Sequence, residues 1–193
     1  MSIDISQEIL TCKVWPGDPE PQTERLCDMH KGDLYNLTKL SMCAHNGTHV
    51  DAPLHFIADG KSIDQLPLEP FVGDCYVARH DGDVKAEHAA QILKEAAKAD
   101  ASQRILIAGK ATVTAEAAEV FAQAGILLIG NESQTVGPEN APMHVHRILL
   151  GAGVVLLEGI VLTDVKAGKY FLNAAPLNFS GCEGSPCRAI LIR

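Results

Sequence analysis

The segment from His45 to Phe56 gathers side chains that can bind a metal ion. It reads His-Asn-Gly-Thr-His-Val-Asp-Ala-Pro-Leu-His-Phe, so three of the eight histidines and one carboxylate fall within eleven positions. Imidazole nitrogen and carboxylate oxygen suit borderline divalent ions such as zinc or manganese. A polar cluster this dense is costly to bury unless a cation neutralises it. Since the segment is no low-complexity histidine tract of the loose metal-buffering kind, it predicts a specific metal site.

The spacing requires a bend in the chain. Four ligand-type side chains occupy odd-numbered positions: His45, His49, Asp51 and His55. A strand would direct them to one face, but it would hold the Cα atoms of His45 and His49 roughly 13 Å apart. Donor atoms must each lie about 2.0–2.2 Å from a shared ion. Gly47 can adopt the dihedral angles of such a bend, and Pro53 is expected to block helix formation and to push Ala52 toward extended geometry.

Other readings of these residues stay open. A lone histidine beside a Gly/Pro turn is more often a surface or capping residue, and only the density of the cluster favours a metal site. Cys43 precedes His45 by two residues and is either a soft ligand or a core thiol. The six cysteines, at 12, 27, 43, 75, 182 and 187, form no CxxC pair, which indicates reduced and mostly buried thiols.

Composition limits the partners of the chain. Its 193 residues, 47% hydrophobic and 21% charged, suit one domain spanning 1–193. The net charge of −8 without a clustered Lys/Arg stretch argues against nucleic acid and anionic membrane surfaces, and favours small molecules. No apolar run reaches the roughly 18 residues of a spanning helix. The start lacks a basic end followed by an apolar core, so we expect a cytoplasmic protein.

Two kinds of element must position the candidate ligands. The first 80 residues alternate short apolar runs with Pro/Gly/Asp turns, which predicts strands and loops. Later segments predict helices and short, doubly covered strands, and hence an α/β fold. The helices are expected at 85–98, 114–124 and 142–151, and the strands at 104–108, 125–130, 154–157, 170–175 and 188–192.

His146 and Glu158 are candidates outside the first cluster. His146 lies on the third predicted helix, and Glu158 follows the apolar run Val154–Leu157 at the carboxyl end of a strand, where α/β sheets usually contact ligands. Alone, they would be a surface imidazole and a strand-end carboxylate. A carboxylate near the interior, however, normally has a cation or a hydrogen-bonding partner.

With its pattern His45-x-Gly-Thr-His-x-Asp-x-Pro-x-His55-Phe, the chain resembles the cyclase family, which includes bacterial kynurenine formamidase and isatin hydrolase. The likeness covers nearly the whole chain. Asp4-Ile-Ser6 and Val14-Trp-Pro-Gly-Asp18 resemble the family opening, Leu157-Glu-Gly159 a late metal segment, and Gly184-Ser-Pro-Cys-Arg188 the ending. The resemblance implies a mixed sheet or barrel-like core with flanking helices, of the swivelling β/β/α type.

The resemblance also implies a role for each site residue. His45, His49 and Asp51 would hold one divalent ion, and Asp51 would be shared with a second ion bound by His146 and Glu158. His144 does not fit the twelve-residue separation from Glu158 and is the weaker candidate. His55 matches the proton donor and acceptor of the family, and Trp15 its substrate-contact tryptophan, although Trp15 could equally pack under the Pro16-Gly17 turn.

These roles amount to a metal-dependent amidohydrolase that acts on a small formamide, lactam or cyclic imide. Two zinc or manganese ions would lower the pKa of a bound water to about 7, and His55 would carry protons as general acid and base. A polyketide cyclase or dehydratase that uses the same metals without net hydrolysis remains an alternative, as does a non-catalytic metal-binding protein. The resemblance further implies a homodimer or higher homo-oligomer, in which a neighbouring chain could help to close the pocket.

Overall fold

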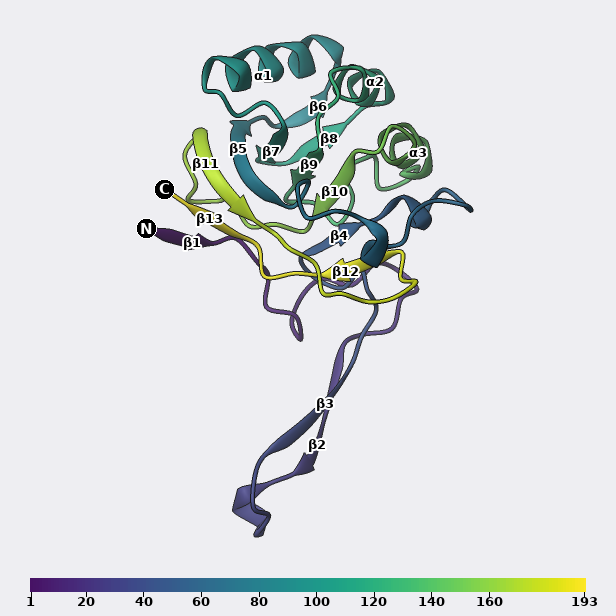
Figure 1. Cartoon of the computed structure of the whole chain (residues 1–193), viewed down its shortest axis with the longest axis vertical. Helices are drawn as coiled ribbons and strands as arrows, with labels where there is room; N and C mark the ends of the chain where they lie inside the picture. Colours follow the sequence, from purple (N-terminus) through teal and green to yellow (C-terminus); the bar gives the residue numbers. More distant parts are fainter.

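Nine strands form one mixed sheet that curls into a half-barrel (Figure 1). The structure, a computed structural model, describes residues 1–193. In order across the sheet, the strands are β1 (Ser2–Asp4), β13 (Ile190–Ile192), β11 (Gly168–Asn173), β5 (Val72–Arg79), β7 (Arg104–Ala108), β9 (Leu128–Asn131), β10 (Val155–Glu158), β4 (His49–Asp51) and β12 (Gly184–Pro186). The central strands β5, β7, β9 and β10 are parallel, and the strands on either side of them pair antiparallel.

Three helices connect the parallel strands and lie together on one side of the sheet (Figure 1). They are α1 (Ala86–Lys98), α2 (Ala115–Gln123) and α3 (Met143–Gly151). Parallel strands need such crossover connections because the chain must return to the opposite end of the sheet before the next strand begins, and a tight turn cannot span that distance. Two short strands, β6 (Gly82–Val84) and β8 (Ala111–Val113), pair beside them. None of the helices combines the length and apolar character needed to cross a bilayer.

The core has two layers, one on each face of the sheet. Phe121 and Leu149 pack with Ile107 beneath the helices, whereas Val50 and Leu157 belong to the cluster on the other face. All residues of β7 and β10 are buried, as their continuous apolar runs predict for strands covered on both sides. The α/β fold with a mixed, barrel-like sheet and flanking helices is therefore confirmed.

The helix predictions are confirmed to within a residue or two. The side chain of Thr114 accepts a hydrogen bond from the backbone N–H of Ala117 at 3.3 Å, so this threonine caps α2. Pro142 directly precedes α3, where its missing N–H leaves no hydrogen bond unmade. The predicted strand at 104–108 coincides with β7, but the run that starts at Gly125 becomes a strand only at Leu128.

β4 brings the histidine-rich segment against the sheet. In the antiparallel pair with β10, His49 lies opposite Glu158 and Asp51 lies opposite Leu156. The bend between His45 and His49 is confirmed, since Gly47 has a φ of +65°, in the left-handed region that favours glycine. This register, rather than local sequence, carries Glu158 to the first cluster.

Two local predictions are wrong. Pro53 does not block helix formation, because residues Pro53–His55 form a 3₁₀ turn in which the proline occupies the first position, although Ala52 is extended as expected. Further 3₁₀ turns are Met29–Lys31 and Ile63–Gln65. The second wrong prediction is that the cysteines are mostly buried. All six are free, as predicted, but only Cys75 is buried and the other five are partly exposed.

A hairpin projects far from the body of the protein (Figure 1). It consists of β2 (Gln22–Cys27), the turn Met29–Lys31 and β3 (Leu37–Ser41), and we call residues 22–41 the arm. The two strands pair only with each other. The arm exposes six large apolar side chains: Leu26, Met29, Leu34, Tyr35, Leu37 and Leu40.

Candidate metal centre

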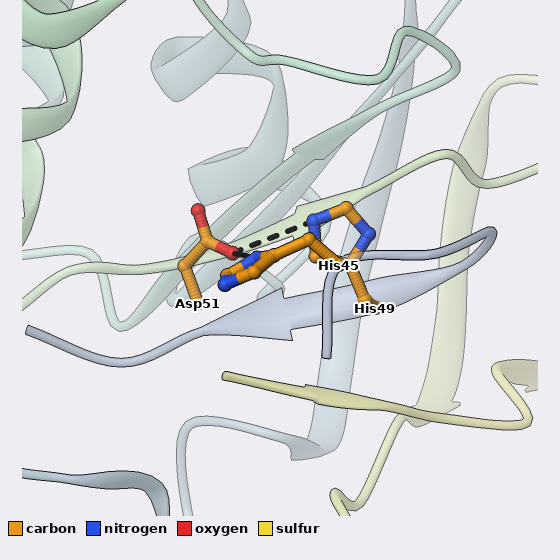
Figure 2. Close-up of side chains that lie close together, drawn as sticks. All are labelled: His45, His49 and Asp51. Carbon is orange, nitrogen blue, oxygen red and sulfur yellow. Dashed lines mark hydrogen bonds and ion pairs between the residues drawn. The ribbon is translucent and has the colours of Figure 1, made fainter. Parts of the chain in front are cut away.

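The carboxylate of Asp51 is the centre of the candidate site. Asp51 is completely buried. Its Oδ1 atom lies 2.9 Å from Nδ1 of His45 and 3.5 Å from Nε2 of His49, and Figure 2 shows both imidazoles turned toward this oxygen. The other oxygen, Oδ2, lies 3.5 Å from Nε2 of His146. Three imidazoles from two distant segments thus surround a single carboxylate.

Glu158 closes the other side of the cluster. Its Oε2 atom is 3.5 Å from Nε2 of His49, and its Oε1 atom is 3.2 Å from Nε2 of His146. Oε1 also accepts a hydrogen bond of 2.7 Å from the backbone N–H of Val136, which fixes the carboxylate. The β4–β10 register supplies Glu158 and the buried face of α3 supplies His146.

The ligand atoms fall into two groups that share Asp51. One group is His45, His49 and Asp51, and the other is Asp51, His146 and Glu158, with the atoms of each group within 4.8 Å of one another. The five residues that the sequence singled out as metal ligands therefore converge. His144 is exposed on α3, and neither His144 nor Cys43 belongs to either group.

The donor atoms fit divalent cations. Nδ1 of His49 is 2.9 Å from the carbonyl oxygen of Gly47, and Nδ1 of His146 is 2.9 Å from that of Pro142. A carbonyl only accepts, so both rings hold a proton on Nδ1, and in neutral rings the Nε2 lone pairs are directed at carboxylates. Oδ2 of Asp51 is buried without a hydrogen-bond partner. A cation between these atoms would satisfy all of them.

The charges of the site also suit a cation. Burial lowers the pKa of His45, but the hydrogen bond and charge of Asp51 raise it to about 9. Burial likewise opposes protonation of His146, yet Asp51 and Glu158 raise its pKa to about 10. Burial would raise the pKa of Asp51, but the neighbouring imidazoles of His146 and His45 hold it well below its usual value. The pocket thus retains protons to balance its carboxylates, and a divalent ion can take their place.

His55 lies beside the cluster but belongs to neither ligand group. Its ring stacks on His45 with centroids 4.1 Å apart and an interplanar angle of 26°. Burial lowers the pKa of His55 below its usual 6.5, so the ring is neutral at pH 7 and can accept a proton. A neutral imidazole beside the ligands, but outside both ligand groups, is suited to proton transfer.

A cavity of about 430 Å³ opens above these residues. This volume suits one small molecule. Trp15 and Phe56 supply aromatic surface, Gln134 and Thr135 supply hydrogen-bonding groups, and no lysine or arginine lines the cavity. Trp15 was anticipated from sequence. Phe56, Gln134 and Thr135 were not.

Glu183 is another residue that the sequence did not single out. Its Oε1 atom lies 3.3 Å from Nε2 of His45, on the far side of the ring from Asp51, and it lines the cavity. The only sequence signal is its position directly before Gly184, the start of the closing segment. A single acidic residue at such a place carries no motif by itself.

The chain resembles known proteins in sequence and in fold. The sequence model of the cyclase family matches residues 2–138. A kynurenine formamidase from Salinibacter ruber is 35% identical over 208 aligned positions, which cover 98% of this chain and 96% of that protein.

Solved structures with the same fold include a protein described as a potential metal-dependent hydrolase with cyclase activity. It has a TM-score of 0.81 at 26% identity, and the alignment covers 99% of this chain and 96% of that protein. Isatin hydrolase A from Labrenzia aggregata has a TM-score of 0.83 at 23% identity, covering 99% of this chain and 93% of its own. At this identity the second likeness is one of fold.

Proposed function

This chain belongs to the cyclase family and is a metal-dependent amidohydrolase acting on C–N bonds other than peptide bonds, and we propose that its substrate is a small formamide, lactam or cyclic imide. The observation that carries the proposal is the convergence of two ligand groups on Asp51 below a cavity of about 430 Å³. The 35% identity to a kynurenine formamidase over nearly the whole chain supports a substrate of the formamide type.

The proposed centre holds two divalent cations, zinc or manganese. His45, His49 and Asp51 would hold one, and Asp51, His146 and Glu158 would hold the other. When bound, such cations supply Lewis acidity, which polarises a carbonyl group and makes water a nucleophile at neutral pH. Imidazole and carboxylate donors accept either metal, so metal analysis of the purified protein decides between them.

His55 is proposed to move the proton. A ring nitrogen of neutral His55 would take a proton from the attacking water while the water oxygen bonds to the carbonyl carbon. The same imidazole would then donate that proton to the leaving nitrogen as the C–N bond breaks. The stacking of His55 on His45 supports this role because it holds the ring directly beside the ligand groups.

The cavity walls orient the substrate. Trp15 and Phe56 present apolar surface on which a planar ring can pack, while Gln134 and Thr135 can hydrogen-bond to polar substituents. The absence of lysine and arginine from the lining favours a neutral or cationic organic part. These walls would leave the carbonyl group directed toward the ligand groups, of which His45, His49, His146 and Glu158 line the cavity.

A substrate panel tests the proposed function. The protein, stripped with a chelator and reloaded with zinc or manganese, is incubated with formanilides, lactams and cyclic imides, and the release of amine or the opening of rings is followed. We expect turnover of at least one class in the reloaded protein and loss of that turnover in the stripped protein. A reloaded, folded protein that hydrolyses no member of the panel contradicts the proposal.

We also propose that residues 1–193 act as one cytoplasmic domain. The pairing of β1 with β13 supports a single domain, since the first and the last strand lie in one sheet. The six free cysteines suit a reducing compartment.

The assembly is proposed to be a homodimer or higher homo-oligomer in which a second copy packs on the arm. An isolated two-stranded hairpin is marginally stable in water, and this one exposes six large apolar side chains. Replacement of Leu34 and Leu40, exposed by 92% and 61%, with serine should therefore raise the dimer dissociation constant at least about tenfold. Sedimentation velocity measures the change, and a parent protein that is monomeric at micromolar concentration contradicts the proposal.

A further inference from the structure

The three histidines of the two ligand groups are oriented in two different ways. His49 and His146 each hold Nδ1 on a backbone carbonyl oxygen, that of Gly47 or of Pro142, within their own segment. His45 has no such carbonyl partner. Its Nδ1 faces Asp51 at 2.9 Å, and its Nε2 faces the carboxylate of Glu183 at 3.3 Å. The hydrogen-bond partner of Nε2 is thus a side chain 138 positions away in the sequence.

Backbone pairing holds Glu183 at this place. The carbonyl oxygen of Glu183 accepts a hydrogen bond of 2.8 Å from the N–H of Ala52, and the next residue, Gly184, pairs with Asp51. The ladder that carries Asp51 therefore also carries Glu183. A Cβ atom at Gly184 would lie 2.7 Å from Cε1 of His45, so the glycine leaves room for the ring to lie against β12.

We propose that Glu183 is a positioning residue for the metal centre, where it accepts the Nε2–H of His45 and keeps Nδ1 directed at the site of the ion. The inference rests on the proposed function, because it assigns His45 as a ligand. A metal-bound histidine usually donates its other ring N–H to a carboxylate or a carbonyl, and this partner fixes the tautomer and the ring angle. Glu183 has the chemistry and position for this task.

The geometry separates this role from direct metal binding. Glu183 lies beyond the ring of His45 from Asp51 and belongs to neither ligand group. Its side chain is 43% exposed, whereas those of Asp51 and Glu158 are buried. Another acidic residue, Asp18, lines the same cavity and is a matched control, since its removal changes the local charge equally and it makes no hydrogen bond or ion pair with His45.

The test compares zinc affinity in Glu183→Ala, Glu183→Gln and Asp18→Asn with the parent, measured by competition with a chromophoric chelator. Loss of such a partner typically costs about 10–100-fold in metal affinity, and we expect this rise in the zinc dissociation constant for Glu183→Ala. Glu183→Gln keeps an acceptor oxygen and should lose less. Asp18→Asn should change the constant least. Circular dichroism of each metal-free variant controls for folding.

Nitrogen-15 NMR of the zinc-loaded protein gives a second readout that a merely structural role would not move. In the parent, His45 should show a protonated Nε2 with slow exchange, and this signal should broaden or move in Glu183→Ala while the signals of His49 and His146 stay. An unchanged zinc affinity, an equal loss in Asp18→Asn, or the loss of one whole zinc ion in Glu183→Ala would each overturn the inference. If the parent binds zinc but hydrolyses no amide, the proposed function fails, and these affinities still decide the role of Glu183.

Discussion

Asp51→Asn should leave the purified protein without bound metal and lower kcat/KM by at least about a thousandfold. Asp51 is the only residue common to both ligand groups, so its carboxylate is expected to contact both ions. Metal activation contributes several kcal/mol to the rate, and each 1.36 kcal/mol is about tenfold. Asparagine has nearly the same size, so the substitution removes charge without opening a cavity.

Glu158→Gln is the matched comparison for this variant. Glu158 is also buried but belongs to one ligand group only. Elemental analysis should therefore find one ion per chain in Glu158→Gln and none in Asp51→Asn. Circular dichroism shows whether both variants are folded. Two ions per chain in a folded Asp51→Asn protein would contradict the shared-ligand assignment.

His55→Ala should keep its metal content and lose about 10²–10⁴-fold in kcat, the usual contribution of a general acid or base. The imidazole of His55 contacts His45 by stacking but lies in neither ligand group, so its removal leaves every donor atom in place. Added imidazole should restore part of the activity if the lost function is proton transfer. The measurement is a single-turnover rate with metal content determined on the same sample.

The control for this variant is His144→Ala. His144 is an exposed histidine on the helix that carries His146, and it lies outside the cavity lining. Its replacement should change neither the metal content nor the rate. A His55→Ala protein as active as the His144→Ala protein would show that another group moves the proton.

Local predictions were correct where contacts between near neighbours decide the feature, and less so where distant packing decides it. Thr114 caps α2 and Gly47 bends the chain because hydrogen bonds and steric limits between near neighbours decide both features. Pro53 was misjudged for a local reason, because the proline sits at the first position of a 3₁₀ turn, where it is tolerated. The partial exposure of Cys43 depends instead on what packs around it, which no short segment specifies.

The candidate site divides in the same way. The density of ligand side chains in 45–55 predicted a metal site from the sequence alone, and the family resemblance added the expectation that His146 and Glu158 bind a second ion. Neither residue type nor spacing could show that Glu158 lies opposite His49, since strand register depends on which strands pair. Glu183 was missed for this reason, because its distance to His45 depends on the pairing of β12 with β4.

The amino-acid sequence by itself determined the chemistry of this protein: which side chains can bind a cation, where the chain must turn, and which segments form helices. Only the tertiary structure decided how these parts meet, with Asp51 shared between two ligand groups, Glu183 behind His45, and the arm projecting from the body. The physical reason is that propensities and turns arise from contacts within a few residues. Strand order and burial arise from apolar packing between segments that can be far apart in the sequence, as β4 and β10 are.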